Sequence, residues 1–153
     1  MALKLAAHAM ATRFELVLDG DDEARLRAAG EDALDEIARF DAQLSFYQST
    51  SDVSWINGHA AFEPVLVEPR LFELLDRCLA LSAATDGAFA ITIAPLMKAW
   101  RFTDGNGAHP DAAVLTRARA LVGFRGVELD AARRTVRFAR PGMLIDLGSA
   151  GKG

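Results

Sequence analysis

The chain has 153 residues, of which 51% are hydrophobic and 25% charged, and it carries a formal net charge of −4. This composition predicts one globular domain over residues 1–153 with a sizeable core, and the acidic balance argues against a surface that binds nucleic acid. The single cysteine, Cys78, excludes an internal disulfide, and its place in a leucine-rich stretch predicts a core residue.

The opening residues, MALKLAAHAMATRF, lack the sustained apolar run and the cleavage site of a secretory signal. No apolar run in the chain approaches the roughly 20 residues that a membrane-spanning helix needs. We therefore expect a cytoplasmic chain as given, or a periplasmic or membrane-anchored protein if a leader has been removed.

The first half of the sequence predicts one strand and two helices. Phe14, Leu16 and Leu18 alternate with polar residues over 13–18, which is typical of a half-buried strand. Apolar residues then recur every three or four positions over 22–44 and predict a long amphipathic helix, with acidic residues in its early turns. A polar stretch leads to a second helix, which begins near Pro69 and ends at the sequence TDG.

The second half of the sequence predicts shorter elements. Strand formers begin the stretch 88–100, which passes through Pro95 toward a short helix, and a third helix spans 109–123 and is closed by Gly123. Residues 126–130, 134–140 and 143–147 predict three short strands, the first two joined by a turn. Because helices and strands are mixed without strict βαβ alternation, we predict an α+β fold with a mostly antiparallel sheet.

The last eleven residues, MLIDLGSAGKG, place Asp146 in an apolar run that opens into a glycine-rich loop with one lysine, Lys152. A Walker A loop needs glycine six residues before the lysine, where Asp146 stands, and the glycines are spaced in the reverse of the Rossmann order. Glycines still allow the backbone to approach an anion or a metal, and Lys152 supplies a cation. An ordinary turn after a strand is the alternative.

Two further stretches also allow two interpretations. Tyr47 follows the first long helix, among serines, where its ring could stack on a flat heterocycle or pack on the protein's own surface. The small residues after Gly87 lie between two packed elements. They could present their backbone to a ligand or form a buried crossover.

Together, four stretches resemble the N-terminal half of the ApbE family, the FAD:protein FMN transferases. In chain order they are AMATRFEL, LSFYQSTSDVSWIN, TDGAFAITIAPLMKAWRF and PGMLIDLGSAGKG. The resemblance implies half of a duplicated, T-fold-like α+β architecture whose C-terminal half is absent here. It also implies an Mg2+-dependent enzyme that cleaves FAD and attaches FMN to a threonine of a partner flavoprotein, such as a subunit of a membrane redox complex.

The resemblance assigns the flavin contacts of the first three stretches. Met10 corresponds to a methionine that lines the flavin site, and Tyr47 corresponds to the residue that stacks on the isoalloxazine. The segment Ala88, Phe89 and Ala90 corresponds to one that contacts FAD through its backbone. Ala90 stands where the family has an aspartate, so no side-chain role is expected there.

The resemblance also assigns the glycine-rich loop. Asp146 corresponds to an FAD-binding aspartate, Ser149 to a position that lends an oxygen to Mg2+, and Lys152 to a further FAD contact. Asp146 and Lys152 are therefore the expected catalytic residues, and Mg2+ beside the pyrophosphate would neutralise charge that develops as the phosphoanhydride breaks.

The family's second half carries the remaining Mg2+ ligands, so we expect the 153-residue chain alone to be inactive. We also expect apolar surface on residues 135–138 and 143–147, with unpaired groups at a strand edge, to join copies into a homo-oligomer. Two alternatives to a transferase stay open. One is an FAD-binding module that lacks catalysis or acts only with a second half, and the other is a structural α+β domain whose loops bind nothing in particular.

Overall fold

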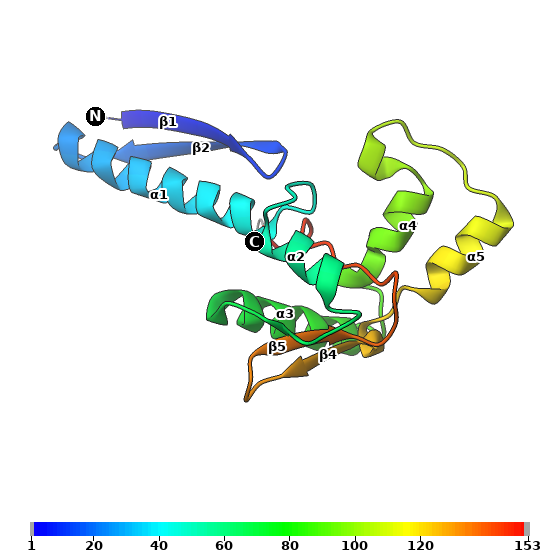
Figure 1. The fold of residues 1–153 in the computed structure, drawn as a ribbon. Coiled ribbons are helices and arrows are strands. Elements are labelled where there is room, and N and C mark those ends of the chain that lie inside the picture. The colour runs from blue at the N-terminus through cyan, green and yellow to red at the C-terminus, as the bar shows by residue number, and fades with distance from the viewer. Residues whose placement is uncertain (1, 152–153) are drawn as a thin grey trace.

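A two-stranded hairpin and a long helix open the chain in the computed structural model, which describes residues 2–151 (Figure 1). Strands β1 (Ala2–Ala9) and β2 (Thr12–Asp19) pair antiparallel along their whole length. The alternation over 13–18 therefore predicted β2 correctly. Strand β1 was not predicted, because its alanine-rich sequence carries little strand propensity and its partner decides its conformation.

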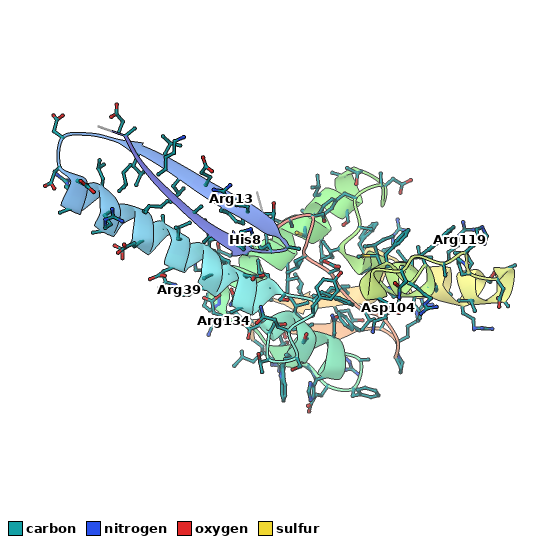
Figure 2. All side chains as sticks on the ribbon, turned by 90° about the horizontal axis from the view of Figure 1, so that it is seen from above. His8, Arg13, Arg39, Asp104, Arg119 and Arg134 are labelled. Carbon is teal, nitrogen blue, oxygen red and sulfur yellow. The ribbon has the colours of Figure 1, made fainter. Side chains whose placement is uncertain are left out.

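Helix α1 (Glu23–Leu44) confirms the long amphipathic helix. The Asp22 side chain caps its first turn by accepting a hydrogen bond from the Arg25 N–H at 3.1 Å. Gly30 lets the hairpin lie close to the helix, since a Cβ there would stand 2.4 Å from a Leu5 methyl and 2.8 Å from a Leu18 methyl. The hairpin runs along α1 in both views (Figures 1 and 2).

The main core lies under two further helices and a small sheet. Helices α2 (Asp52–His59) and α3 (Pro69–Ala84) pack near an antiparallel sheet with the order β3 (Val65–Leu66), β5 (Thr135–Phe138), β4 (Val127–Asp130). Helix α3 and the β4–β5 hairpin confirm the prediction, whereas α2 and β3 were not predicted. The α+β fold class with antiparallel sheets is thereby confirmed.

Cys78 of α3 is buried in this core, as predicted. Burial among apolar side chains raises the pKa of the Cys78 thiol, so the thiol stays protonated and unreactive at neutral pH.

Short helices connect α3 to the β4–β5 hairpin. They are η1 (Ile91–Ile93), α4 (Ala94–Ala99), η2 (Phe102–Asp104), α5 (Ala112–Ala120) and η3 (Phe124–Gly126). The strand formers after Gly87 thus adopt a 3-10 turn rather than a strand. Helix α5 is shorter than the predicted span 109–123, because Asp111 caps its start by accepting from the Val114 N–H at 2.7 Å.

The prediction of a strand over 143–147 was wrong. Met143, Ile145 and Leu147 are buried and alternate with more exposed residues, as in an extended chain, but the segment joins no sheet in the described part of the protein. An asparagine side chain takes the place of a strand partner at Ile145. The alternation of apolar residues predicted burial correctly here, but it could not predict which groups would bond to the backbone N–H and C=O.

The apolar surface expected on residues 135–138 and 143–147 is also absent. Val136 and Phe138 are 0% and 1% exposed, and β5 is the central strand of its sheet rather than an edge. The predicted apolar surface is therefore wrong, whereas the homo-oligomer itself stays a prediction. Within residues 2–151, no helix is both long enough and apolar enough to cross a membrane.

Candidate functional site

A strained turn places Met10 near the end of α1. Met10 and Ala11 join β1 to β2 with φ values of 51° and 55°, a left-handed pair that glycine or asparagine adopts more easily. The four steps along the strand from Leu5 to Ala9 advance about 13 Å, which equals about nine residues of helix. Counted from Gly30, which Leu5 contacts, the turn therefore reaches the last two turns of α1, as Figure 1 shows.

Tyr47 lies just beyond the same end of α1. The Ser45 hydroxyl accepts hydrogen bonds from the N–H groups of Tyr47 and Gln48, both at 3.2 Å, and so holds the turn. Tyr47 is 65% exposed. Its ring contacts the Phe46 ring in an edge-to-face arrangement, with centroids 5.5 Å apart. The ring does not pack into the core, which leaves it available for a ligand.

The segment 88–90 follows a well-defined end of α3. The Phe89 N–H donates to the Thr85 hydroxyl at 3.1 Å, and the Ala88 N–H donates to the Thr85 carbonyl at 3.1 Å. Asp86 and Gly87, with φ values of 50° and 82°, turn the chain between them. Backbone contacts from this segment to a ligand would therefore have to come from its carbonyl oxygens or from the Ala90 N–H.

Asp146 is half-buried and held on two sides. Its backbone N–H donates to the Ile91 carbonyl at 2.8 Å, which brings the glycine-rich loop beside the segment that follows Ala90. Its Oδ1 accepts from the Gly148 N–H at 2.7 Å, and a Cβ at Gly148 would stand 3.0 Å from that oxygen. The loop therefore supplies the backbone donor that a carboxylate in an apolar run requires, and leaves Oδ2 for another donor.

The glycine-rich loop returns to the end of α1. The N–H groups of Ala150 and Gly151 both donate to the Leu147 carbonyl, and a Cβ at Gly151 would stand 3.0 Å from a Leu44 methyl. Ser149 is exposed at the tip of this turn. Lys152 lies outside the described residues.

Four predicted segments therefore meet at one end of α1, which we call the α1 junction: Met10, Tyr47, the stretch 88–91 and the loop 146–151. Two residues that the sequence analysis did not single out also lie there. The Asn57 side chain bonds to Ile145, and the Lys98 ammonium lies 5.6 Å from the centroid of the Phe46 ring. Both residues lie in stretches that carry the family resemblance, 44–57 and 85–102, but the resemblance assigned a role to neither.

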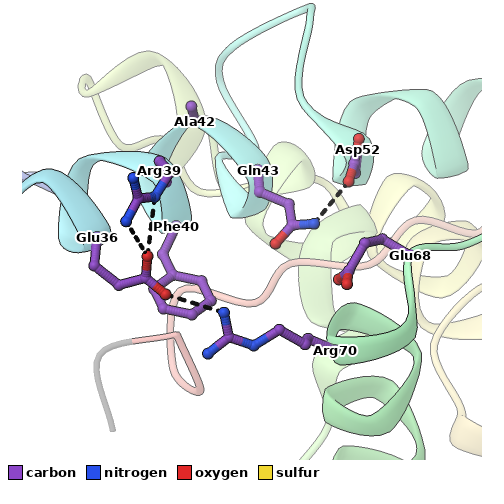
Figure 3. Close-up of a pocket in the computed structure, with 8 residues that line it drawn as sticks. All are labelled: Glu36, Arg39, Phe40, Ala42, Gln43, Asp52, Glu68 and Arg70. Atoms are coloured by element: carbon purple, nitrogen blue, oxygen red, sulfur yellow. Dashed lines mark hydrogen bonds and ion pairs between the residues drawn. The ribbon is translucent and has the colours of Figure 1, made fainter.

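A cavity of about 440 Å3 lies beside the junction, between α1 and the first turns of α2 and α3 (Figure 3). It contains none of the predicted flavin residues. Arg39 and Arg70 both pair with Glu36, and the Arg70 guanidinium lies 5.2 Å from the centroid of the Phe40 ring. Hydrogen bonds from Arg39 and Arg70 lower the pKa of Glu36. Both arginines are thus engaged by a side chain of the protein itself, so we interpret the cavity as a contact between helices and not as a ligand site.

Comparison with known proteins gives one family. The model of the ApbE family matches residues 10–153. An FAD:protein FMN transferase of Klebsiella pneumoniae (strain 342) is 36% identical over 117 residues, which are 76% of this chain and 37% of that protein. Another, from Treponema pallidum (strain Nichols), is 32% identical over 135 residues, which are 85% of this chain and 37% of that protein.

Solved structures agree with the sequence relatives. The crystal structure of the ApbE protein from Thermotoga maritima matches with a TM-score of 0.91 at 28% identity, over 100% of this chain and 49% of that one. The apo flavinyl transferase ApbE of Pseudomonas stutzeri matches with a TM-score of 0.82 at 28% identity, over 97% of this chain and 50% of that one. The chain thus spans between about a third and a half of the length of these relatives. It belongs to the ApbE family.

Proposed function

We propose that the α1 junction is one side of a flavin site, and that this protein takes part in the transfer of FMN from FAD to a threonine of an acceptor flavoprotein. The observation that carries the proposal is the exposed Tyr47 ring just beyond the end of α1, where the loop that begins at Asp146 returns to Leu44. Relatives that carry the name FAD:protein FMN transferase support the reaction class.

Each segment has a role that its geometry can support. The Tyr47 ring would stack on the isoalloxazine, and Met10 would border the flavin from the hairpin turn. The carbonyl oxygens of Ala88 and Phe89, with the N–H of Ala90, would bond to polar groups of FAD. Oδ2 of Asp146 would accept from a ligand donor, since Oδ1 already accepts from the loop.

The charged part of the site would hold the pyrophosphate. Lys152 would place a cation beside it, and the Ser149 hydroxyl would supply one oxygen ligand to Mg2+, which neutralises charge on the phosphoanhydride when it is bound. Among residues 2–151 no group of three or more His, Cys, Asp and Glu side chains is placed to hold a metal ion. We therefore propose that the 153-residue chain alone does not transfer FMN.

That proposal is tested by incubating the chain with FAD and Mg2+ and measuring AMP by chromatography. We expect no AMP above the level of a protein-free sample, because Mg2+ is usually held by one or two carboxylates beside the phosphates. Release of AMP at an enzymatic rate, lost when Mg2+ is chelated, would show that the ligands in this chain are sufficient.

The flavin site itself is tested with Asp146→Ala. We expect FAD affinity, measured by calorimetry, to fall more than the free energy of unfolding. The matched control is Asp130→Ala, because Asp130 accepts a backbone N–H from Arg133 at 3.0 Å in a turn remote from the junction. If both variants lose stability alike and Asp146→Ala still binds FAD normally, Asp146 is a structural residue and the assignment is wrong.

A further inference from the structure

The Asn57 side chain replaces a strand partner for Ile145. Its Nδ2 donates to the Ile145 carbonyl at 2.9 Å, and its Oδ1 accepts from the Ile145 N–H at 2.8 Å. The two residues are 88 positions apart in the chain, and the Ile145 side chain is 0% exposed. One carboxamide therefore satisfies both polar groups of a buried residue, as a neighbouring strand would.

This clamp acts directly on the next residue, Asp146. The Ile145 backbone is bonded to α2, and the following N–H, that of Asp146, is bonded to the Ile91 carbonyl at 2.8 Å. Consecutive backbone groups are thus fixed to two different parts of the fold. With both fixed, the direction in which the Asp146 carboxylate leaves the backbone has little freedom.

Helix α2 also holds the Tyr47 turn through its other end. Ser51 caps α2 by accepting from the Ser54 N–H at 3.0 Å, and its hydroxyl donates to the Ser45 carbonyl. The Ser54 hydroxyl donates to the Gln48 carbonyl at 2.7 Å. Val53 and Ile56, at 0% and 1% exposed, anchor the helix in the core. One rigid helix therefore connects the Tyr47 turn to the Asp146 segment.

We propose that Asn57 is a positioning residue that sets the distance and direction of Asp146 relative to Tyr47, and so controls flavin affinity without contacting the flavin. This inference rests on the proposed flavin site. At neutral pH an amide of this length offers a donor and an acceptor side by side. An ionised carboxylate at the same place would accept from the Ile145 N–H but would face the Ile145 carbonyl with no proton to donate.

The test compares Asn57→Ala and Asn57→Asp with wild type, well below every melting temperature, by calorimetric titration with FAD. We expect Asn57→Ala to bind FAD about tenfold more weakly, because the segment that carries Asp146 is released. Asn57→Asp should be about equally weak at pH 7.5. At pH 5.5 its affinity, taken relative to wild type at the same pH, should recover, because the half-buried carboxyl beside the Ile145 carbonyl then carries the missing proton.

The matched control for fold stability is Val136→Ala, since Val136 is 0% exposed in the core and makes no part of the junction. It should lower the melting temperature and leave FAD affinity unchanged. If Asn57→Ala loses stability but binds FAD as wild type does, or if Val136→Ala weakens binding equally, the positioning role is refuted. If wild type does not bind FAD, the proposed flavin site itself is refuted. That result differs from a refuted positioning role, in which wild type and Asn57→Ala bind FAD equally.

Discussion

The segments around the two ends of α1 are held together by different interactions. At its N-terminal part, the hairpin is packed against α1 by apolar side chains, with Leu5 and Leu18 closing over Gly30. At its C-terminal end, segments far apart in the sequence are joined by directed hydrogen bonds, those of Asn57 to Ile145 and of Asp146 to Ile91.

This difference distinguishes the hairpin contact, which supports the fold, from the α1 junction, which we propose as the flavin site. Apolar packing depends on shape and tolerates small adjustments, whereas a buried hydrogen bond needs both partners at fixed positions and is costly when one is removed. The proposed flavin residues lie where the directed bonds are. The hairpin contributes one of them, Met10, from its turn.

Asn57→Ala should have the largest effect on stability, because it removes the directed hydrogen bonds to Ile145. It leaves the N–H and the carbonyl of buried Ile145 without partners, so we expect a loss of about 2–4 kcal/mol in the free energy of unfolding. Urea denaturation measures this. Asn106→Ala, on an exposed loop, is the control, and equal stability of the two variants would contradict the account.

Gly30→Leu tests the packed side. The new side chain would collide with Leu5 and Leu18 and should cost about 1–3 kcal/mol, mostly as loosening of the hairpin. Hydrogen exchange of β1 and β2 would report this loosening. A stable hairpin in Gly30→Leu would show that shape does not limit this contact.

Gly58→Ala is the opposite case, since a Cβ there meets nothing within 4 Å in α2. The variant should gain about 0.5–1 kcal/mol in the free energy of unfolding.

Tyr47→Ala sharpens the comparison at the ligand side. Loss of ring stacking should weaken FAD binding about tenfold while stability changes little, because the ring is exposed. Tyr47→Phe should be mild, since the face of the ring matters more than its hydroxyl. Phe62→Ala, which removes another exposed ring, serves as control, and calorimetry that finds both alanine variants equally affected would remove the role of Tyr47.

Glu68→Ala should have the smallest effect and lies outside both regions. Glu68 caps α3, and hydrogen bonds from the N–H groups of Arg70 and Leu71 lower its pKa below the ordinary value of 4.5. At pH 7 the variant should lose about 1 kcal/mol. Because the carboxylate form stabilises the fold, the contribution is full above the unfolded pKa and is lost as pH falls through the lower folded pKa. A difference in melting temperature between wild type and Glu68→Ala that is the same at pH 7 and at pH 3 would contradict this.

Much of the fold could be predicted from local pattern. The periodicity of α1 and α3, the alternation of β2 and the turn between β4 and β5 all express burial directly in the sequence. Strand β1 and helix α2 could not be predicted in this way. An alanine-rich strand takes its conformation from its partner, and α2 is too short and too evenly mixed in polarity to show a helical stripe.

The site followed a similar division. Family resemblance marked Met10, Tyr47 and Asp146, and the structure brings their segments to one place. Asn57 ends the stretch 44–57 that carries the resemblance, but neither pattern nor resemblance gave it a role, because its partner is a backbone group 88 residues away and any residue type can supply a backbone group. The wrong prediction of a strand over 143–147 and the failure to single out Asn57 have one cause. The Asn57 side chain makes the hydrogen bonds to Ile145 that a neighbouring strand was expected to make.

The most direct test is hydrogen–deuterium exchange of the chain with and without saturating FAD. We predict added protection in the peptides that contain Met10, Tyr47, residues 88–91 and residues 145–151. Protection centred instead on residues 36–43 and 68–70, which line the cavity beside the junction, would contradict this prediction, and so would unchanged exchange throughout the chain.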